Sequence, residues 1–333
     1  MAYYDDKLET LKSVFGTDEI VLEPDALVVA GGRFPIIDDV IVLLKPEQFT
    51  PFVAATLRAR SVAPGDPEGR TADDIQSTFG EEWKEYPEVL AEHRGEFDQY
   101  FDLIDLRTLR DARVCDVGCG NGRWSVFLKD YCRELVLLDF SDAIFVARRN
   151  LASALNAVFI MGDLQKLPFA KDCCDLVVCL GVLHHLPTPC LEAVRALRNF
   201  SPRHLVFLYY ALDNRPWYFR LLLASATLLR RLLLRVRHPG LRKVIARTVA
   251  LLLYRPLVGM GTLVRPLGLG RYVPLYEFYH GKSLRRIEQD VYDRFFTPIE
   301  QRVSRLEIQS LGDSFAEIRV SDHLPYWHFL CVR

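Results

Sequence analysis

Apolar and polar positions alternate regularly over residues 113–210. Short apolar runs are separated by segments in which apolar residues recur at helical spacing. The apolar runs fall at 113–117, 135–139, 157–161, 175–180 and 204–210, and the amphipathic segments fall near 123–131, 141–154 and 188–199. This alternation predicts an α/β fold in which parallel strands form one sheet and the connecting helices cover both of its faces.

The region before this alternation has a different pattern. Residues 20–44 are predicted to form a small β module, because short apolar runs are broken there by turn residues. The turns are expected at Glu23-Pro24-Asp25, Gly31-Gly32 and Asp38-Asp39. A linker follows, with Pro64-Gly65-Asp66-Pro67 and Gly69 as its breakers, and residues 71–110 have a helical pattern interrupted near Pro87.

The end of the chain predicts one helix and two strands. Thr297-Pro298-Ile299-Glu300 has the pattern of a capping box with proline at the first helical position. A helix is therefore expected from there to about Gly312. Two strands, near 315–320 and 326–332, are expected to be joined by a turn around Asp322 and Pro325.

Composition is that of an ordinary globular protein. Of 333 residues, 50% are apolar and 26% charged, and the net charge is −1. The first ten residues, MAYYDDKLET, are polar and acidic, so no signal peptide is expected. The eight cysteines show no paired CxxC spacing and are expected to be reduced thiols of a cytoplasmic protein rather than metal ligands.

One segment is charged very differently from the rest. Residues 214–276 contain no Asp or Glu but eleven arginines and Lys243, which gives +12 against −13 for the other 270 residues. On a helical wheel of 217–237, most leucines fall in one sector of about 140° and the arginines fill the remainder. Neither apolar run of the segment has the roughly 18 uncharged residues that span a bilayer.

Three interpretations of this basic segment stay open. It can lie on an anionic membrane surface as an amphipathic helix, or form a lid that recognises a lipophilic or phosphorylated acceptor. It can also be a helical cap whose arginines pair with the acidic remainder of the protein. Nucleic acid is not expected as a partner, because the segment is rich in leucine rather than polar residues.

A glycine-rich loop follows the first apolar run of the alternating region, in RVCDVGCGNGRWS (113–125). Such a turn between a strand and a helix presents backbone N–H groups to an anionic ligand group. Arg123 stands where the dinucleotide pattern GxGxxG requires its third glycine, and Asp116 would repel a pyrophosphate. Because a carboxylate favours an ammonium group, the loop suits an amino acid joined to a nucleoside, as in S-adenosylmethionine.

Two further acids follow the next apolar runs. Asp139 ends the second run, where a carboxylate can accept both hydroxyl groups of a ribose. Asp163 follows the third run, where it can accept from the amine of adenine. Taken singly, Asp139 is as well explained as a turn residue and Asp163 as a loop acid. Three acids at the carboxyl ends of successive strands predict a ligand along one sheet edge.

With these motifs the sequence resembles the class I S-adenosylmethionine-dependent methyltransferases. The resemblance rests on VCDVGCGNG (114–122), LLDFS (137–141), GDLQKLPF (162–169) and DLVVCLGVLHHLP (175–187). It implies a Rossmann-like seven-stranded sheet whose last strand is antiparallel, completed by the strand pair at 315–332. It also implies that S-adenosyl-L-methionine is the cofactor.

The resemblance implies a role for several residues. The methionine end would be lined by Asp116, Gly118, Cys119, Gly120 and Asn121. The nucleoside and sulfonium would meet Asp139 and Phe140 at the ribose, Asp163 and Leu164 at the base, and Leu180 and His185 beneath the sulfur. In FGEEWKEY (79–86), Trp83 or Tyr86 would close over the methionine moiety, the alternative being that both only pack the helical arm.

Candidates for a general base are three histidines. His184 and His185 follow the fourth strand and are expected to face the site, and His280 in YEFYH (276–280) is the alternative from the lid side. The other interpretation is that the paired histidines only shape the pocket. Three tyrosines are candidates for an acceptor pocket or for the core: Tyr276, Tyr279 and Tyr292.

These predictions divide the chain into five parts. They are a small β module (1–60), a linker and helical arm (61–110), a methyltransferase core (111–212), a basic helical insertion (213–290), and a terminal helix with a strand pair (291–333). The first part resembles a zinc-ribbon-like segment, but no cysteine precedes Cys115, so no metal is expected.

The function expected from the sequence is S-adenosylmethionine-dependent methyl transfer to a small-molecule, glycan or lipid-linked acceptor, at oxygen. Peripheral contact with an anionic membrane is an additional expectation. Two alternatives remain, a nicotinamide-dependent oxidoreductase and a non-catalytic interaction module with the same fold. Arg123 and Asp116 speak against the first, and the three retained acids speak against the second.

Overall fold

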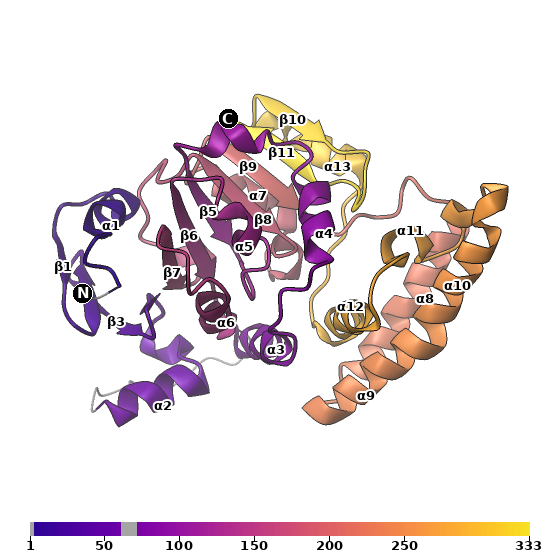
Figure 1. Ribbon diagram of the computed structural model, residues 1–333, viewed down its shortest axis with the longest axis horizontal. Coiled ribbons are helices and arrows are strands. Elements are labelled where there is room, and N and C mark those ends of the chain that lie inside the picture. Colours follow the sequence, from indigo (N-terminus) through magenta and orange to yellow (C-terminus); the bar gives the residue numbers. More distant parts are fainter. Residues whose placement is uncertain (1–2, 61–71) are drawn as a thin grey trace.

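The computed structural model describes residues 3–60 and 72–333, and the predicted linker breakers between 64 and 69 lie outside this range. Its centre is a mixed sheet with helices on both faces (Figure 1). Seven strands form the central part, in the order β7 (Ala157–Met161), β6 (Glu134–Asp139), β5 (Arg113–Val117), β8 (Leu176–Leu180), β9 (Arg203–Phe207), β11 (Phe329–Val332) and β10 (Glu317–Val320). Neighbours from β7 to β9 are parallel, and β11 is antiparallel to β9. The predicted α/β class is confirmed.

The strand count differs from the seven that the sequence predicted. Four N-terminal strands bring the sheet to eleven within the described residues. They are β1 (Ile20–Leu22), β2 (Ala26–Val29), β3 (Gly32–Ile37) and β4 (Val40–Val42). The turns fall where expected, with positive φ at Gly31, Asp38 and Asp39. Because β4 pairs in parallel with β7, the small β module is a continuation of the core sheet and not a separate unit.

Helices cover the two faces of the sheet because each presents an apolar stripe to it. On one face, buried residues come from α2 (Pro51–Ala59), α4 (His93–Tyr100), α5 (Ser125–Leu128) and α6 (Ala143–Asn150). On the other face they come from α1 (Leu8–Phe15), α7 (Cys190–Leu197) and α13 (Arg305–Gln309). The strands of the central sheet are buried on both sides, as parallel strands under helices must be.

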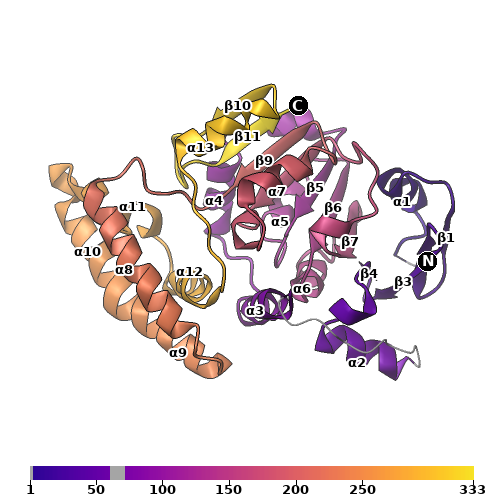
Figure 2. The ribbon, with the colours of Figure 1, turned by 180° about the vertical axis from the view of Figure 1, so that it is seen from behind.

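The basic segment forms most of a helical cap beside the sheet, at the opposite end of the molecule from the N-terminal strands (Figures 1 and 2). The cap consists of α8 (Trp217–Leu233), α9 (Pro239–Val249), a π-helical turn (Ala250–Tyr254), α10 (Arg255–Val264), α11 (Tyr276–Tyr279) and α12 (Leu284–Phe296). Its own core is rich in tyrosine and phenylalanine, with Tyr254, Tyr279 and Tyr292 among the buried residues. The domain boundary predicted at 290 therefore falls inside α12.

Some basic residues of the cap pair with acids outside the acid-free segment. The pairs are Arg215–Glu277, Arg230–Glu300, Arg242–Glu81, Lys243–Glu85 and Arg247–Glu288. The leucine face of α8 stays open to solvent, since Leu228 is 62% exposed and Leu232 is 53% exposed. Within the described residues, one continuous helical stretch, Pro239–Leu267, is long and apolar enough to cross a membrane by length and composition alone. In its most apolar window, 28% is buried inside the protein.

The helix predicted over 297–312 starts later than expected, because α13 begins at Arg305, and a 3-10 turn (Ser310–Asp313) continues it to the predicted end. Thr297 ends α12 in an extended conformation, and its hydroxyl donates to Asp293 Oδ1 at 2.9 Å. The capping box lies seven residues later, where Ser304 Oγ accepts from the N–H of Glu307 and the Glu307 side chain binds back to Ser304. Glu300 is not a capping residue because its carboxylate is engaged with Arg302 at 2.7 Å.

Candidate functional site

A cavity of about 720 Å³ lies between the carboxyl edge of the central strands and the helical cap. Residues after β5, β6, β7 and β8 line one wall, and α3 (Ala72–Glu85) contributes Phe79, Glu82 and Trp83. Residues of α8, α10 and α12 line the opposite wall. A ligand in an open α/β sheet is expected at this edge.

The glycine loop after β5 requires glycine at three positions. Gly118, Gly120 and Gly122 have φ values of +71°, +56° and +76°, which residues with a Cβ rarely adopt. A Cβ on Gly120 would stand 2.7 Å from the indole of Trp83. Trp83 is thus packed on the loop and also lines the cavity, while its closure over a methionine moiety stays a prediction. Tyr86 packs in the core of the cap instead.

Two of the three predicted acids line the cavity. Asp139 accepts from the N–H of Gly120 at 2.9 Å and from the N–H of Ser141 at 2.8 Å. Burial raises the pKa of Asp139, and these backbone N–H groups lower it in part. Asp163 accepts from the N–H of Gln165 at 3.0 Å and also lines the cavity.

Asp116 and Asn121 are placed differently from the prediction. Neither is among the residues that line the cavity. Asp116 is 1% exposed and accepts from the Ser125 hydroxyl at 2.6 Å, and burial raises its pKa to about 7. Asn121 is fully buried, and its Nδ2 donates to the carbonyl of Tyr86 at 3.3 Å. Both hold the loop in place, and their contact with a cofactor stays a prediction.

The remaining predicted cofactor residues share one property, which is that all of them line the cavity. They are Gly118, Cys119, Gly120, Phe140, Leu164, Leu180 and His185. They come from four loops that the parallel sheet brings to one edge. The spacing of the motifs along the chain therefore located this wall of the cavity.

The three histidines differ sharply in position. His185 lines the cavity; its Nδ1 donates to the carbonyl of Ile299 at 2.7 Å, which leaves Nε2 of the neutral ring as an acceptor. His184 is fully buried against Tyr209, and its two ring nitrogens have no hydrogen-bond partner among the described residues. Burial lowers the pKa of His184 well below its ordinary value, so it is a packing residue.

His280 is also not placed as predicted. It is exposed, lies 3.4 Å from an Arg265 nitrogen and is absent from the cavity wall. The short helix α11 turns it outward while Tyr279 points inward. Of the three candidate tyrosines, only Tyr279 lines the cavity, whereas Tyr276 and Tyr292 pack in the cap.

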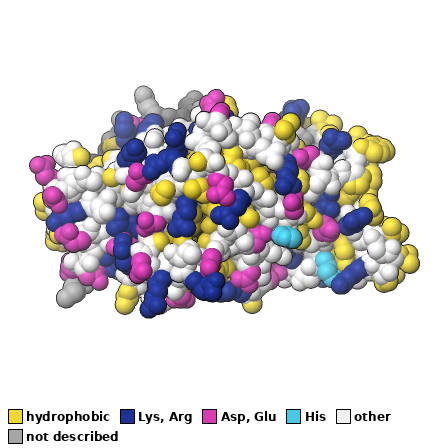
Figure 3. All heavy atoms as spheres, turned by 90° about the horizontal axis from the view of Figure 1, so that it is seen from above, with side chains coloured by type: hydrophobic (Ala, Val, Ile, Leu, Met, Phe, Trp, Pro, Cys, Tyr) yellow, Lys and Arg dark blue, Asp and Glu magenta, His cyan; other side chains and the backbone are white. Residues whose placement is uncertain are grey.

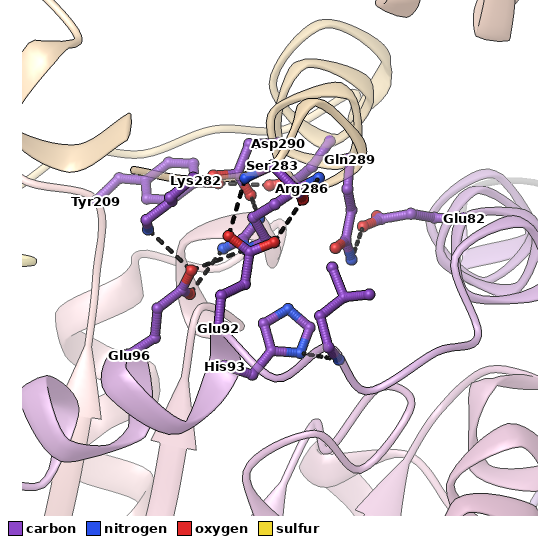
Figure 4. Close-up of polar contacts among 12 residues, drawn as sticks. Glu82, Glu92, His93, Glu96, Tyr209, Lys282, Ser283, Arg286, Gln289 and Asp290 are labelled. Atoms are coloured by element: carbon purple, nitrogen blue, oxygen red, sulfur yellow. Dashed lines mark hydrogen bonds and ion pairs between the residues drawn. The ribbon is translucent and has the colours of Figure 1, made fainter. Parts of the chain in front are cut away.

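A charged network under α12 was missed by sequence reasoning (Figure 4). Arg286 donates to both carboxylate oxygens of Glu96 at 3.0 Å and also pairs with Asp290. Lys282 lies 2.8 Å from Glu96. Burial alone would raise the pKa of Glu96, but Arg286 and Lys282 hold it below its usual range. The network fixes the cap to α4, and its partners are too distant along the chain for a local pattern to reveal them.

A second missed group lies beside Trp83. Glu82 is 3% exposed, and its Oε1 accepts from Gln289 at 3.4 Å, whereas its Oε2 has no partner among the described residues. Burial raises the pKa of Glu82 well above its ordinary value. Arg123 also lines the cavity and is stacked between Trp83 and Trp124, with Nη1 unpaired within the described chain.

Comparison with known proteins agrees with the site geometry. Residues 114–201 match the family described as a methyltransferase domain. A putative methyltransferase of Encephalitozoon cuniculi is 30% identical over 131 residues, which cover 38% of this chain and 54% of that protein. A ubiquinone biosynthesis O-methyltransferase of Xanthomonas oryzae pv. oryzae is 29% identical, with 41% of this chain and 59% of that protein covered.

Solved structures give weaker similarity. The PH0226 protein of Pyrococcus horikoshii is 28% identical and covers 37% of this chain and 63% of its own, with a TM-score of 0.32. A phosphoethanolamine N-methyltransferase of Haemonchus contortus, solved with phosphoethanolamine and S-adenosylhomocysteine, is 18% identical, covers 40% of this chain and 31% of its own, and has a TM-score of 0.36. The chain spans a little over half the length of the curated relatives it matches.

Residues 114–201 are a methyltransferase domain of the S-adenosylmethionine-dependent class. The side chains present fit this cofactor. Asp139 offers a carboxylate to a ribose, and Phe140 offers a ring beside it. Oε2 of Glu82 and Nη1 of Arg123, both unpaired within the described chain, are candidates to bind an amino-acid ammonium and carboxylate. Glu82 is thus a second candidate, beside Asp116, for the ammonium partner.

Proposed function

We propose that the protein transfers a methyl group from S-adenosylmethionine to an oxygen of a small-molecule or lipid-linked acceptor. The observation that carries this proposal is one continuous cavity that joins the glycine loop and Asp139 to His185 and the cap. Relatives named as O-methyltransferases support oxygen as the acceptor atom. A glycan acceptor, also expected from the sequence, has no specific support in the cap.

The chemistry asks the protein mainly to align the acceptor and to exclude water. When bound, the cofactor supplies an electrophilic methyl group on sulfur. The cap lies across the cavity from the loops and would keep solvent from the reacting atoms. Nε2 of His185 would accept the proton of the acceptor oxygen as that oxygen is methylated.

Neighbouring groups support His185 as the base. Its Nδ1 hydrogen bond to Ile299 fixes the ring so that Nε2 is the free nitrogen. Asp293 Oδ1 lies 3.9 Å from Nε2 and would stabilise the protonated ring. Tyr209 donates its hydroxyl to the other oxygen of Asp293, which holds that carboxylate in place.

The test uses labelled S-adenosylmethionine and a lysate of the source organism. We expect a labelled product with the wild-type protein, and a rate lower by about 10²–10⁴ with His185→Gln at little change in donor affinity. Calorimetric titration with NAD addresses the oxidoreductase alternative. Tight NAD binding without binding of the methyl donor would overturn the proposal, and donor binding without turnover on any extract would favour an interaction module.

We also propose peripheral contact of the cap with an anionic membrane. Hydrophobic side chains gather at the end of the molecule formed by the cap (Figure 3). Leu221, Leu252 and Leu263 are 58%, 76% and 79% exposed, and arginines such as Arg231 and Arg235 are also exposed on the cap. Leucines with adjacent arginines match the acyl and anionic layers of such a surface.

A further inference from the structure

Arg294 on α12 is a cavity-lining cation without an acidic partner. No ion pair joins it to a carboxylate among the described residues, and its Nε is buried with no hydrogen-bond partner there. Its guanidinium lies over the ring of Tyr209, 5.6 Å from the centroid. Arg215 and Arg286, which also line the cavity, are paired with Glu277 and Glu96. Arg294 therefore has no ion-pair partner within the described residues; burial opposes its charge, and Glu300 acts on it only at longer range, raising its pKa.

The surroundings of Arg294 carry an excess of positive charge. Arg302 lies 2.7 Å and Arg230 3.4 Å from the same carboxylate, that of Glu300. Burial and the nearby Arg294 lower the pKa of Arg302. The second carboxylate of this region is Asp293, which already accepts from the hydroxyls of Tyr209 and Thr297. Three guanidinium groups thus face two carboxylates, and one positive charge is left over.

Two phenols complete the surroundings. Tyr254 and Tyr279 are both buried, both line the cavity, and their rings lie 5.2 Å apart. Guanidinium and phenol groups together are donors to carboxylate or phosphate oxygens. A buried guanidinium that has lost its hydration is unfavourable unless an anion and further hydrogen bonds replace the water. A bound anionic group would remove this cost.

The wall beyond Arg294 is apolar. The cavity continues between α8 and α10, where the lining residues are leucines, phenylalanines and other apolar side chains. They include Phe219, Leu222, Leu229, Leu253, Leu257 and Phe278. Three of them reach the surface, since Leu222, Leu229 and Leu253 are 50%, 42% and 48% exposed. The apolar lining of this part of the cavity, which includes leucines exposed at the cap surface, matches an acyl or alkyl chain.

We propose that Arg294, with Tyr254 and Tyr279, binds the anionic group of an amphiphilic acceptor whose chain lies between α8 and α10. The assignment rests on the proposed function, because it makes this group part of the methyl acceptor. Arg294 follows Asp293, which is the neighbour of His185. The oxygen to be methylated is therefore close to a carboxylate or phosphate on the same molecule.

The test measures binding of simple amphiphiles rather than turnover. Decyl phosphate, decyl maltoside and inorganic phosphate are titrated by calorimetry below micellar concentrations, in the presence of S-adenosylhomocysteine. We expect decyl phosphate to bind at least 10-fold tighter than decyl maltoside and about 100-fold tighter than inorganic phosphate. Arg294→Gln should abolish the preference for the phosphate, and the exposed Arg235→Gln should retain it.

Each contrary result overturns one specific part of the proposal. If decyl maltoside binds as tightly as decyl phosphate, the cavity has no anionic subsite. If inorganic phosphate binds as tightly as decyl phosphate, the alkyl chain contributes nothing and the acceptor is not an amphiphile. Thermal unfolding of Arg294→Gln separates binding from folding: we expect a Tm equal to or above that of the wild type, because an unpaired buried charge is removed. A clear fall in Tm would make Arg294 a structural residue. Absence of S-adenosylhomocysteine binding would defeat the proposed function while the amphiphile titration stays readable.

Discussion

The two walls of the cavity are built by opposite means. The loop wall uses short motifs at the ends of parallel strands, where a fixed backbone with positive φ at Gly118 and Gly120 makes the surface. The cap wall uses long side chains from helices that span about 80 residues. The backbone geometry of the loop wall is determined by short sequence motifs, whereas recognition by side chains of the cap wall depends on tertiary contacts. The first wall therefore identifies the cofactor class, and under the proposed function the second would select the acceptor.

The largest effect is expected from a Cβ in the loop wall. Gly120→Ala places a methyl group against Trp83 in a backbone conformation that costs about 1–2 kcal/mol for a residue with a Cβ. We expect S-adenosylhomocysteine affinity to fall at least 100-fold by calorimetry. Decyl phosphate binding at the cap wall should change much less. A joint loss of both affinities would show that the two walls do not act separately.

The next effect concerns the carboxylate behind the loop. The pKa of Asp116 is raised by burial to about 7 from an unfolded value near 3.8, so the folded state holds the proton more tightly. Stability from this group is present below about pH 4 and is lost as the pH rises to about 7. Relative to Asp116→Asn, the wild type should lose at least about 2 kcal/mol of unfolding free energy between pH 4.5 and 8.

Denaturant unfolding across this pH range measures that difference. Asp116→Asn keeps a polar group for Ser125, so the comparison isolates titration rather than the hydrogen bond at 2.6 Å. If the unfolding free energies of the two proteins change in parallel with pH, the pKa of Asp116 is not raised in the folded state. A ligand ammonium bound close to Asp116 would reduce the difference in pH dependence between the two proteins. Repeating the measurement with S-adenosylmethionine therefore tests whether the ammonium lies near Asp116.

A smaller effect is expected at the exposed face of α8. Leu228→Gln with Leu232→Gln should weaken cosedimentation with anionic vesicles by about tenfold per leucine, because each inserted side chain contributes about 1.5–3 kcal/mol. Raising salt should weaken binding further, since the flanking arginines are screened. The matched control replaces Leu155 and Leu306, which are 77% and 76% exposed on the other part of the chain. No wild-type association at low salt would remove membrane contact.

The smallest effect is expected when a glycine of the cap, rather than one of the loop, is replaced by alanine. Gly259 lies inside α10, and a Cβ there meets nothing within 4 Å. Gly259→Ala should raise the unfolding free energy by up to about 1 kcal/mol and leave donor affinity unchanged. Thermal unfolding and donor titration of Gly259→Ala and Gly120→Ala side by side give the contrast. A loss of stability at Gly259 would indicate a close contact that the cap does not show.

The parts of the fold with local signals were predicted well. Strand runs, the Asp38-Asp39 turn and the glycine loop follow from period and turn chemistry. The Thr297 capping box failed because tertiary contacts of Asp293 and Glu300 compete for the same groups. The Arg286–Glu96 pair joins residues 190 positions apart, and the leucine pattern of α8 did not reveal which face stays uncovered. Pairings of this kind are set by the assembled structure.

The parallel pairing of β4 with β7 has a consequence for any attempt to shorten the protein. Without residues 40–42, β7 would become an edge strand whose N–H and C=O groups lie open along a buried apolar segment. A fragment trimmed to the matched region would expose this edge and pair with other copies of itself. Its insolubility would then be mistaken for a defect in catalysis, when the cause is a missing neighbour for one strand.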